Sequence, residues 1–387
     1  MNNTNPTKET PEDLVGDVRQ ILGLEAIKPV EVATPTLIQT PVPVVSPKLE
    51  AILADAQIYE IPTGEAFSKS IYQRKINGRS DSYKTLTTSK YDSAVNQVRN
   101  LYKSINNKEN LKVESAKEIV NSFALILKSD RNILLNFSNM PVSHEDYLYA
   151  HAVNVCLLSL IIASAEGYTE AQTVEVSLAG LLQDVGMELV PEAIMVKNGS
   201  LNAHEIYEVH KHPIHSANIL ESMSGLSPAT LLAIYQHHER MGGTGYPKMK
   251  SSTFVHPYAR IIAIADTYSA LVVDRPYRKK YRPYNAMEAV IKMGATGLFD
   301  TKLIRKFMEC MSLFPLGSLV KLSSGRIGKV VHANPSDFTK PSIAILSDET
   351  GKPMETTTLV ELKTSSEDKI VQALGHEDFQ QTLMDGF

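Results

Sequence analysis

The sequence has 387 residues, of which 43% are hydrophobic and 21% are charged, and its net charge is −4. This length predicts two or three domains with a hydrophobic core, and a chain with so little positive charge is not expected to bind duplex DNA. Cys156 and Cys310 are the two cysteines, and their apolar surroundings predict a reduced, cytoplasmic protein without a disulfide. We expect no membrane association, because the N-terminus lacks a signal peptide's apolar core and the longest apolar run, 156–165, is too short to cross a bilayer.

The N-terminal third of the chain divides into two segments of different composition. Residues 1–47 contain seven prolines, which predicts a disordered, proline-rich leader with at most one short helix near 15–24. Residues 48–140 are expected to form a mixed, largely helical module. Its role is left open, and a sensory or a dimerising module would both fit. Helical patterns lie at 49–54, 91–105 and 113–127.

The rest of the chain predicts a mainly α fold followed by a small β module. Residues 141–315 form the predicted helical bundle, in which 147–165 is apolar on all sides and is expected to be the central buried helix. Residues 316–362 contain short β-type runs separated by turn signals, and 363–387 are expected to be a polar tail with a helix. The other helices are predicted at 171–183 with an end at Gly186, from Ser227-Pro228 to His238, and at 257–272, 286–293 and 301–311, and the strands at 318–322, 328–332 and 343–346.

Histidines gather in the predicted helical bundle. The chain has 11 histidines, and nine of them lie between His144 and His256. Neutral imidazole is the commonest nitrogen ligand of transition metals, so this crowding indicates a metal site built from several helices. The candidate ligands, each on or at the end of a predicted helix, are His151, Asp184, His212, His237, His238 and Asp266.

Taken singly, each candidate ligand also has a structural interpretation. His151 lies on an apolar stripe, where a hydrogen-bonded core histidine is the commoner case. Asp266 could pair with Arg260 or Lys279, and His212 precedes a proline and could simply begin a helix. Asp184 differs, because it ends an apolar run where a buried carboxylate requires a cation or hydrogen-bond donors.

The order of these residues, rather than any one of them, identifies a family. Six segments occur in the order found in the HD-GYP family, a bacterial branch of the HD-domain phosphohydrolases, and the resemblance covers about residues 141–315. They are His151, Leu181-Leu182-Gln183-Asp184-Val185-Gly186, Val209-His210-Lys211-His212-Pro213, the segment from His237 to Gly245-Tyr246-Pro247, Ala259–Asp266 and Asp274-Arg275-Pro276-Tyr277-Arg278-Lys279. The β module resembles the C-terminal extension of some members.

The resemblance implies a metal-dependent phosphodiesterase that hydrolyses cyclic di-GMP with a water activated by two divalent ions, iron or manganese. One ion would be held by His151, Asp184 and Asp266, and the other by His212, His237 and His238, with Asp184 as the bridging, catalytic ligand. Tyr246 would offer its ring to a base. Arg275, Arg278 and Lys279 would face the phosphates, although a basic run after a helix is often only a solvated turn.

Four positions depart from the family pattern, all near the expected chemistry. Gln183 stands where the family has a metal-binding histidine, and Met187 replaces a lysine that contacts phosphate. Met241-Gly242 replaces a Trp-Asp pair, and Tyr147 replaces a glutamate of three-metal members. We therefore expect one or two ions rather than three, with weakened or absent catalysis. Three interpretations stay open: an active phosphodiesterase, a degenerate receptor for cyclic di-GMP or a protein partner, and a metal-free scaffold of the related HDOD type. A homodimer would fit each of them.

Overall fold

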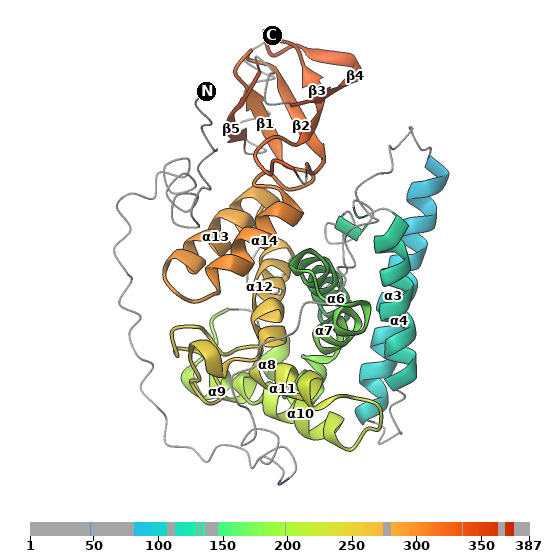
Figure 1. Cartoon of the computed structure of the whole chain (residues 1–387), viewed down its shortest axis with the longest axis vertical. Coiled ribbons are helices and arrows are strands. Elements are labelled where there is room, and N and C mark those ends of the chain that lie inside the picture. The colour runs from blue at the N-terminus through green and yellow to red at the C-terminus, as the bar shows by residue number, and fades with distance from the viewer. Residues whose placement is uncertain are drawn as a thin grey trace, which may run out of the picture.

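The computed structural model describes residues 47, 81–106, 113–129, 131, 134–135, 146–197, 199–273, 280–334, 336–362 and 368–374. Nearly all of the predicted leader, the predicted helix at 49–54 and the predicted phosphate-binding residues Arg275, Arg278 and Lys279 lie outside these residues. The described part confirms a mainly α fold followed by a small sheet (Figure 1). Its helices are α3 (Asp81–Asn106), α4 (Val113–Ser129), α6 (Tyr147–Glu166), α7 (Glu170–Leu182), η3 (Val185–Leu189), α8 (Glu192–Met195), α9 (Ala203–His210), α10 (His212–Glu221), α11 (Pro228–Gln236), η4 (Ser252–Phe254), α12 (Pro257–Val272), α13 (Pro283–Ala295) and α14 (Thr301–Met311).

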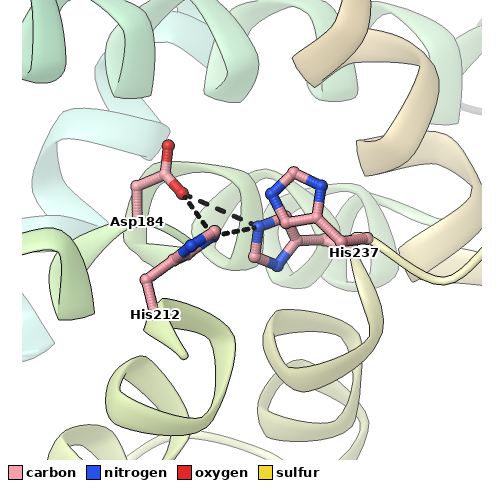
Figure 2. Close-up of side chains that lie close together, drawn as sticks. Asp184, His212 and His237 are labelled. Atoms are coloured by element: carbon pink, nitrogen blue, oxygen red, sulfur yellow. Dashed lines mark hydrogen bonds and ion pairs between the residues drawn. The ribbon is translucent and has the colours of Figure 1, made fainter. Parts of the chain in front are cut away.

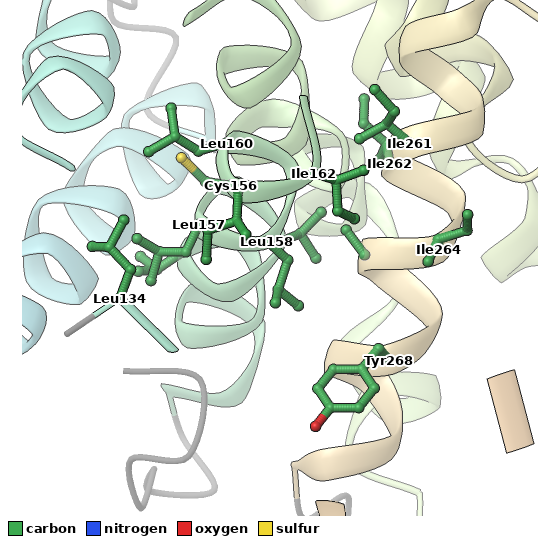
Figure 3. Close-up of a cluster of buried hydrophobic side chains, with 14 of the residues drawn as sticks. Leu134, Cys156, Leu157, Leu158, Leu160, Ile162, Ile261, Ile262, Ile264 and Tyr268 are labelled. Atoms are coloured by element: carbon green, nitrogen blue, oxygen red, sulfur yellow. The ribbon is translucent and has the colours of Figure 1, made fainter. Parts of the chain in front are cut away.

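Helix α6 is the centre of the bundle, as its all-round apolar sequence predicts. Its side chains from Leu148 to Ser164 are buried, and Figure 3 shows Leu158 and Ile162 of α6 in one apolar cluster with Ile261 and Ile264 of α12. By length and composition α6 could cross a membrane, but 89% of the qualifying stretch is buried inside the protein. Burying each large apolar side chain contributes roughly 1.5–3 kcal/mol, so this contact surface holds the bundle together.

Helices α3 and α4 pack directly on the bundle. Their apolar faces belong to the same hydrophobic core as α6 and α7. Tyr91 of α3 donates a hydrogen bond to Asn154 Oδ1 at 2.9 Å, and the hydroxyl of Tyr102 donates to the carbonyl oxygen of Leu181 at 2.7 Å. In the described part of the segment 48–140, the buried faces of α3 and α4 share the core of the bundle. The boundary at 140 and the role of this segment stay predictions.

The C-terminal part is a five-stranded antiparallel sheet in the order β4-β3-β2-β1-β5. Strands β1 (Leu319–Leu322), β2 (Ile327–His332) and β3 (Ser342–Ser347) confirm the three predicted strands, whereas β4 (Pro353–Glu361) and β5 (Ile370–Leu374) were not predicted. The expected helix in the tail is wrong where the tail is described, since β5 lies there and pairs with β1, Leu374 opposite Leu319. Both unpredicted strands are sheet edges, whose exposed side chains carry little apolar alternation.

Helix α12, which carries Asp266, begins at a buried histidine whose protonation should weaken the fold. The Nδ1 atom of His256 accepts a hydrogen bond from the backbone N–H of Tyr258, at 3.2 Å, and burial together with Arg260 lowers the pKa of His256 to about 4. In the unfolded chain this pKa returns to about 6.5. Between these values the unfolded state binds one more proton than the folded state. The contribution of His256 to the free energy of unfolding is therefore fully present above pH 6.5 and is lost as the pH falls towards 4.

We therefore expect the His256 contribution, up to about 3 kcal/mol, to be lost on acidification from pH 7 to pH 4. Urea unfolding of His256→Asn should show a smaller acid loss than the native chain, because asparagine can cap the helix without titrating. His204→Asn is the control, since the His204 side chain is 73% exposed. An equal acid loss in the native chain and in His256→Asn would contradict the prediction.

Candidate metal centre

Asp184 lies at the centre of the predicted ligands. It follows the end of α7, and only 8% of its surface is exposed. Its Oδ1 atom is 3.2 Å from His212 Nε2 and 3.6 Å from His237 Nε2 (Figure 2). Its Oδ2 atom is 3.5 Å from His151 Nε2. The two oxygens of one carboxylate thus face histidines that come from three different helical segments.

A glycine lets His212 approach Asp184. A Cβ atom on Gly186 would lie 2.4 Å from the carbonyl oxygen of His212 and 2.5 Å from the nitrogen of Ser216, so only glycine permits α10 to pack this closely against η3. The hydroxyl of Ser216 links the same segments, donating to the Gln183 carbonyl oxygen at 2.5 Å and accepting from the Gly186 N–H at 2.8 Å. Our expectation that Gly186 ends the preceding helix is wrong. Helix α7 ends at Leu182, and Gly186 is a close-approach residue.

Hydrogen bonds aim two histidine nitrogens at the same point. His212 Nδ1–H donates to the Val209 carbonyl at 2.7 Å, and His237 Nδ1–H donates to the Ile234 carbonyl at 2.6 Å. In a neutral ring the other nitrogen, Nε2, then carries a lone pair. The two Nε2 atoms are only 3.1 Å apart and both face the Asp184 carboxylate. Such a set of electron-pair donors is stable only around a proton or a cation, which fits a divalent metal.

His151 and Asp266 form a second group beside the first. His151 Nε2 is 2.9 Å from Asp266 Oδ1, and its Nδ1 lies 2.9 Å from the hydroxyl of Ser269. The alternative pairing of Asp266 with Arg260 is wrong, because Arg260 instead contacts Asp300 at 3.4 Å. Asp266 therefore faces His151 and the centre, and it does not form an ion pair with Arg260.

The structure brings all six predicted ligands together in two groups that share one residue. The ligand atoms within each group lie within 4.8 Å of one another, and Asp184 belongs to both. The groups are Asp184 with His212, His237 and His238, and Asp184 with His151 and Asp266. Each could hold a metal ion, with Asp184 between the two.

Gln183, which directly precedes Asp184, has a buried amide group without a hydrogen-bond partner among the described residues. Its side chain is fully buried, and neither Oε1 nor Nε2 has a hydrogen-bond partner among the described residues. Leaving such an amide unpaired costs about 1–3 kcal/mol per polar group. An amide oxygen can contact a cation and an amide NH₂ can donate to a water, so an unpaired amide next to Asp184 in the chain is compatible with a metal centre.

The two carboxylates of the centre and His238 are held in their metal-binding protonation states. Burial raises the pKa of Asp184, but the neighbouring imidazoles of His212 and His237 outweigh it and leave this pKa well below its usual range. Burial likewise opposes the His151 hydrogen bond at Asp266, whose pKa is also lowered. Burial, then the neighbouring His237, lowers the pKa of His238 far below its usual range. Ionised carboxylates and a neutral imidazole are the forms that bind metals.

A cavity of about 340 Å³ opens over the two groups. The ligands His151, Asp184, His212, His238 and Asp266 are on its surface, and the remaining wall is largely apolar. This volume lies within the range of small-molecule sites. Met187 and Tyr147, two of the departures from the family pattern, both line the cavity.

The Gly-Tyr-Pro segment lies against the second of the paired histidines. A Cβ atom on Gly245 would be 2.3 Å from the carbonyl oxygen of His238, and Tyr246 N–H donates to that same oxygen at 3.1 Å. The Tyr246 ring stacks on His238 at a centroid distance of 4.5 Å and on His210 at 3.9 Å. Tyr246 lines the cavity with these two rings stacked on it, and the contact of its ring with a base stays a prediction.

Sequence reasoning missed Glu239, the residue directly after the paired histidines. Its buried carboxylate accepts backbone N–H bonds from Lys248 at 2.7 Å and from Lys250 at 2.8 Å, and so fastens the loop that contains Gly-Tyr-Pro. Its position beside two candidate ligands was the available signal. A charged residue at the end of a helix is, however, usually solvated, which hid this role.

Glu239→Gln should destabilise this loop and the fold. A glutamine amide can accept one of the two bonds, but its NH₂ group would then point at the other N–H, so we expect a loss of about 1–3 kcal/mol in the free energy of unfolding. Urea unfolding checks this, with the exposed Glu349→Gln as the control. Equal stability of the two variants would refute the proposed fastening.

Comparisons with known proteins agree with this geometry. The HD domain family matches residues 136–303, and a family described as a KOW domain associated with HD domain matches residues 319–382, which include all five strands. A cyclic di-GMP phosphodiesterase of Pseudomonas aeruginosa is 33% identical over 59% of this chain and 55% of its own length. A cyclic di-GMP phosphodiesterase of Borreliella burgdorferi is 30% identical over 54% of this chain and 55% of its own length.

A third relative has a different substrate in its name. The 3'3'-cGAMP-specific phosphodiesterase 1 of Vibrio cholerae is 32% identical over 44% of this chain and 40% of its own length. The chain thus spans about half the length of the first two curated relatives and less of the third. An HD domain thus covers the bundle, and with the six candidate ligands in family order and the Gly-Tyr-Pro segment beside them, the chain resembles the HD-GYP family of HD-domain proteins.

Proposed function

We propose that this protein is a metal-dependent phosphodiesterase that hydrolyses cyclic di-GMP. The observation that carries the proposal is the sharing of Asp184 between two ligand groups under one cavity. The names of the two relatives that share 33% and 30% identity with this chain support the substrate. When bound, two divalent ions would lower the pKa of a water molecule and stabilise the attacking and leaving oxygens of the phosphodiester.

The chain's own residues would prepare this site. We assign His151, Asp184 and Asp266 to one ion, and His212, His237 and His238 with Asp184 to the other. The carbonyl groups of Val209 and Ile234 fix the orientation of His212 and His237. Such fixed ligands need no reorganisation on binding. The resemblance to the family supports iron or manganese, a cytoplasmic location, and a phosphate-binding role for Arg275, Arg278 and Lys279.

A receptor without turnover is the second candidate, and two observations favour it. Gln183 replaces an imidazole ligand by an amide, which suits iron less well, and Met187 puts an apolar side chain in the cavity where the family has a lysine. Both changes weaken catalysis more than folding. Such a protein would bind cyclic di-GMP or a protein partner through the same cavity.

Hydrolysis by the full chain separates the two candidates. Protein purified without oxygen and supplied with Fe²⁺ or Mn²⁺ should convert cyclic di-GMP into a product visible by chromatography, and 3'3'-cGAMP in a parallel reaction tests the choice of nucleotide. Asp184→Asn is the negative control. Binding of cyclic di-GMP with no product from metal-loaded protein would replace the enzyme by the receptor.

A further inference from the structure

We propose that a stack of three rings, His210–Tyr246–His238, positions His238 as a metal ligand, which makes His210 and Tyr246 positioning residues. The inference rests on the proposed metal centre and assigns a role to His210, which does not belong to either ligand group. It also assigns to Tyr246 of Gly-Tyr-Pro a positioning role, in addition to the predicted contact with a base.

The geometry of the stack is close and continuous. The His210 and Tyr246 rings are inclined by 12° with centroids 3.9 Å apart, and the Tyr246 and His238 rings are inclined by 22° with centroids 4.5 Å apart. Two imidazoles at these distances would collide on one face of a phenol ring, so they occupy opposite faces. Tyr246 is therefore held between an exposed histidine at the end of α9 and a ligand histidine of the centre.

His238 requires this support because it lacks the anchor that the other histidines have. The Nδ1 atoms of His151, His212 and His237 are hydrogen-bonded to Ser269, Val209 and Ile234, respectively. Within the described part of the chain the His238 ring has no hydrogen bond, and its Nδ1 lies 3.9 Å from Asp266 Oδ2. Its remaining contacts are with rings, those of Tyr246, His237 and His212.

The stack also connects two ligand-bearing segments. His210 is two residues before His212, and Tyr246 N–H is bonded to the carbonyl oxygen of His238. Movement of the loop that contains Gly-Tyr-Pro would therefore carry the His238 ring away from His212, which belongs to the same ligand group. Stacking adds to the packing of aromatic rings and favours one ring orientation. Its loss is expected to raise the dissociation constant of one ion and to leave the other nearly unchanged.

The test is a Mn²⁺ titration of the full, metal-free chain, followed by electron paramagnetic resonance. Tyr246→Leu and His210→Leu remove a ring, whereas Tyr246→Phe and His210→Phe keep one. We expect the leucine variants to raise one of the two Mn²⁺ dissociation constants about fivefold and to weaken the signal of coupled ions, and the phenylalanine variants to match the native chain.

Each outcome has a distinct meaning. Unchanged Mn²⁺ affinity and spectrum in both leucine variants would overturn the positioning role, as would phenylalanine variants as weak as the leucine ones, because polar groups rather than rings would then matter. If Tyr246→Leu does not fold, the exposed His210 still provides the test. A native chain that binds no Mn²⁺ would instead overturn the proposed metal centre itself.

Discussion

Asp184→Asn is expected to abolish hydrolysis of cyclic di-GMP. Asparagine keeps the volume of the side chain but removes the charge that both ligand groups share, so both ions would lose a ligand at once. Metal ions supply several kcal/mol of transition-state stabilisation, and the turnover should therefore fall by about a thousandfold or more. Chromatography of the product and the metal content of the purified variant are the two measurements.

The same Asp-to-Asn substitution at a position far from the centre is the control. It distinguishes the effect of losing a charge at the centre from the effect of losing a charge elsewhere in the protein. Asp348 lies in a turn of the β module, where its carboxylate accepts bonds from Thr350 and Lys352, so Asp348→Asn should retain native turnover and metal content. Asp184→Asn protein that still held two ions per chain would show that Asp184 is not the bridging ligand. Loss of activity with both ions in place would point to a role in proton transfer.

Gln183→His is expected to strengthen binding of the ion that we assign to His151, Asp184 and Asp266. The native amide is fully buried with no partner among the described residues, and imidazole is the better ligand for iron. A side chain that binds the ion directly should matter at least as much as the outer partners that change metal affinity 10–100-fold, so we expect a gain of at least about 10-fold. Calorimetric titration with Mn²⁺ or Fe²⁺ under anaerobic conditions measures it.

If the proposed hydrolysis is limited by incomplete metal loading of the native chain, turnover should rise along with the affinity. Gln97→His is the control, because Gln97 lies on the exposed face of α3 and bonds Ser93. Unchanged affinity in Gln183→His would mean that residue 183 is not directed at an ion. Tighter binding without any turnover would favour the receptor and shift attention to Met187.

Much of the helical bundle could be predicted from local sequence, because helix boundaries depend on neighbouring residues. Ser227 followed by Pro228 begins α11, where the Ser227 side chain accepts the N–H of Thr230 as predicted. Helix α12 occupies 257–272 as predicted from its apolar stripe and its initial proline. The identity and order of the candidate ligands could also be predicted from the sequence, because each segment that resembles the family is short and contiguous.

Contacts between segments that are far apart in the sequence could not be predicted. Strands β4 and β5 depend on partners across the sheet, and the docking of α3 on the bundle depends on contacts such as Tyr102 with Leu181. The stack of His210 on Tyr246 joins residues 36 positions apart, and one residue of that pair was predicted to serve the substrate. Pairings of this kind are set by how helices approach one another, which a single sequence does not state.

The sequence by itself predicted the family resemblance, the bundle and the six candidate ligands, because these follow from residue types at near positions along the chain. The tertiary structure decided how they are used. Only folding brings Asp184 between two groups, leaves the Gln183 amide buried without a partner and stacks two histidine rings on Tyr246. The physical reason is that coordination, desolvation and stacking act over a few ångströms in space, whatever the separation along the chain.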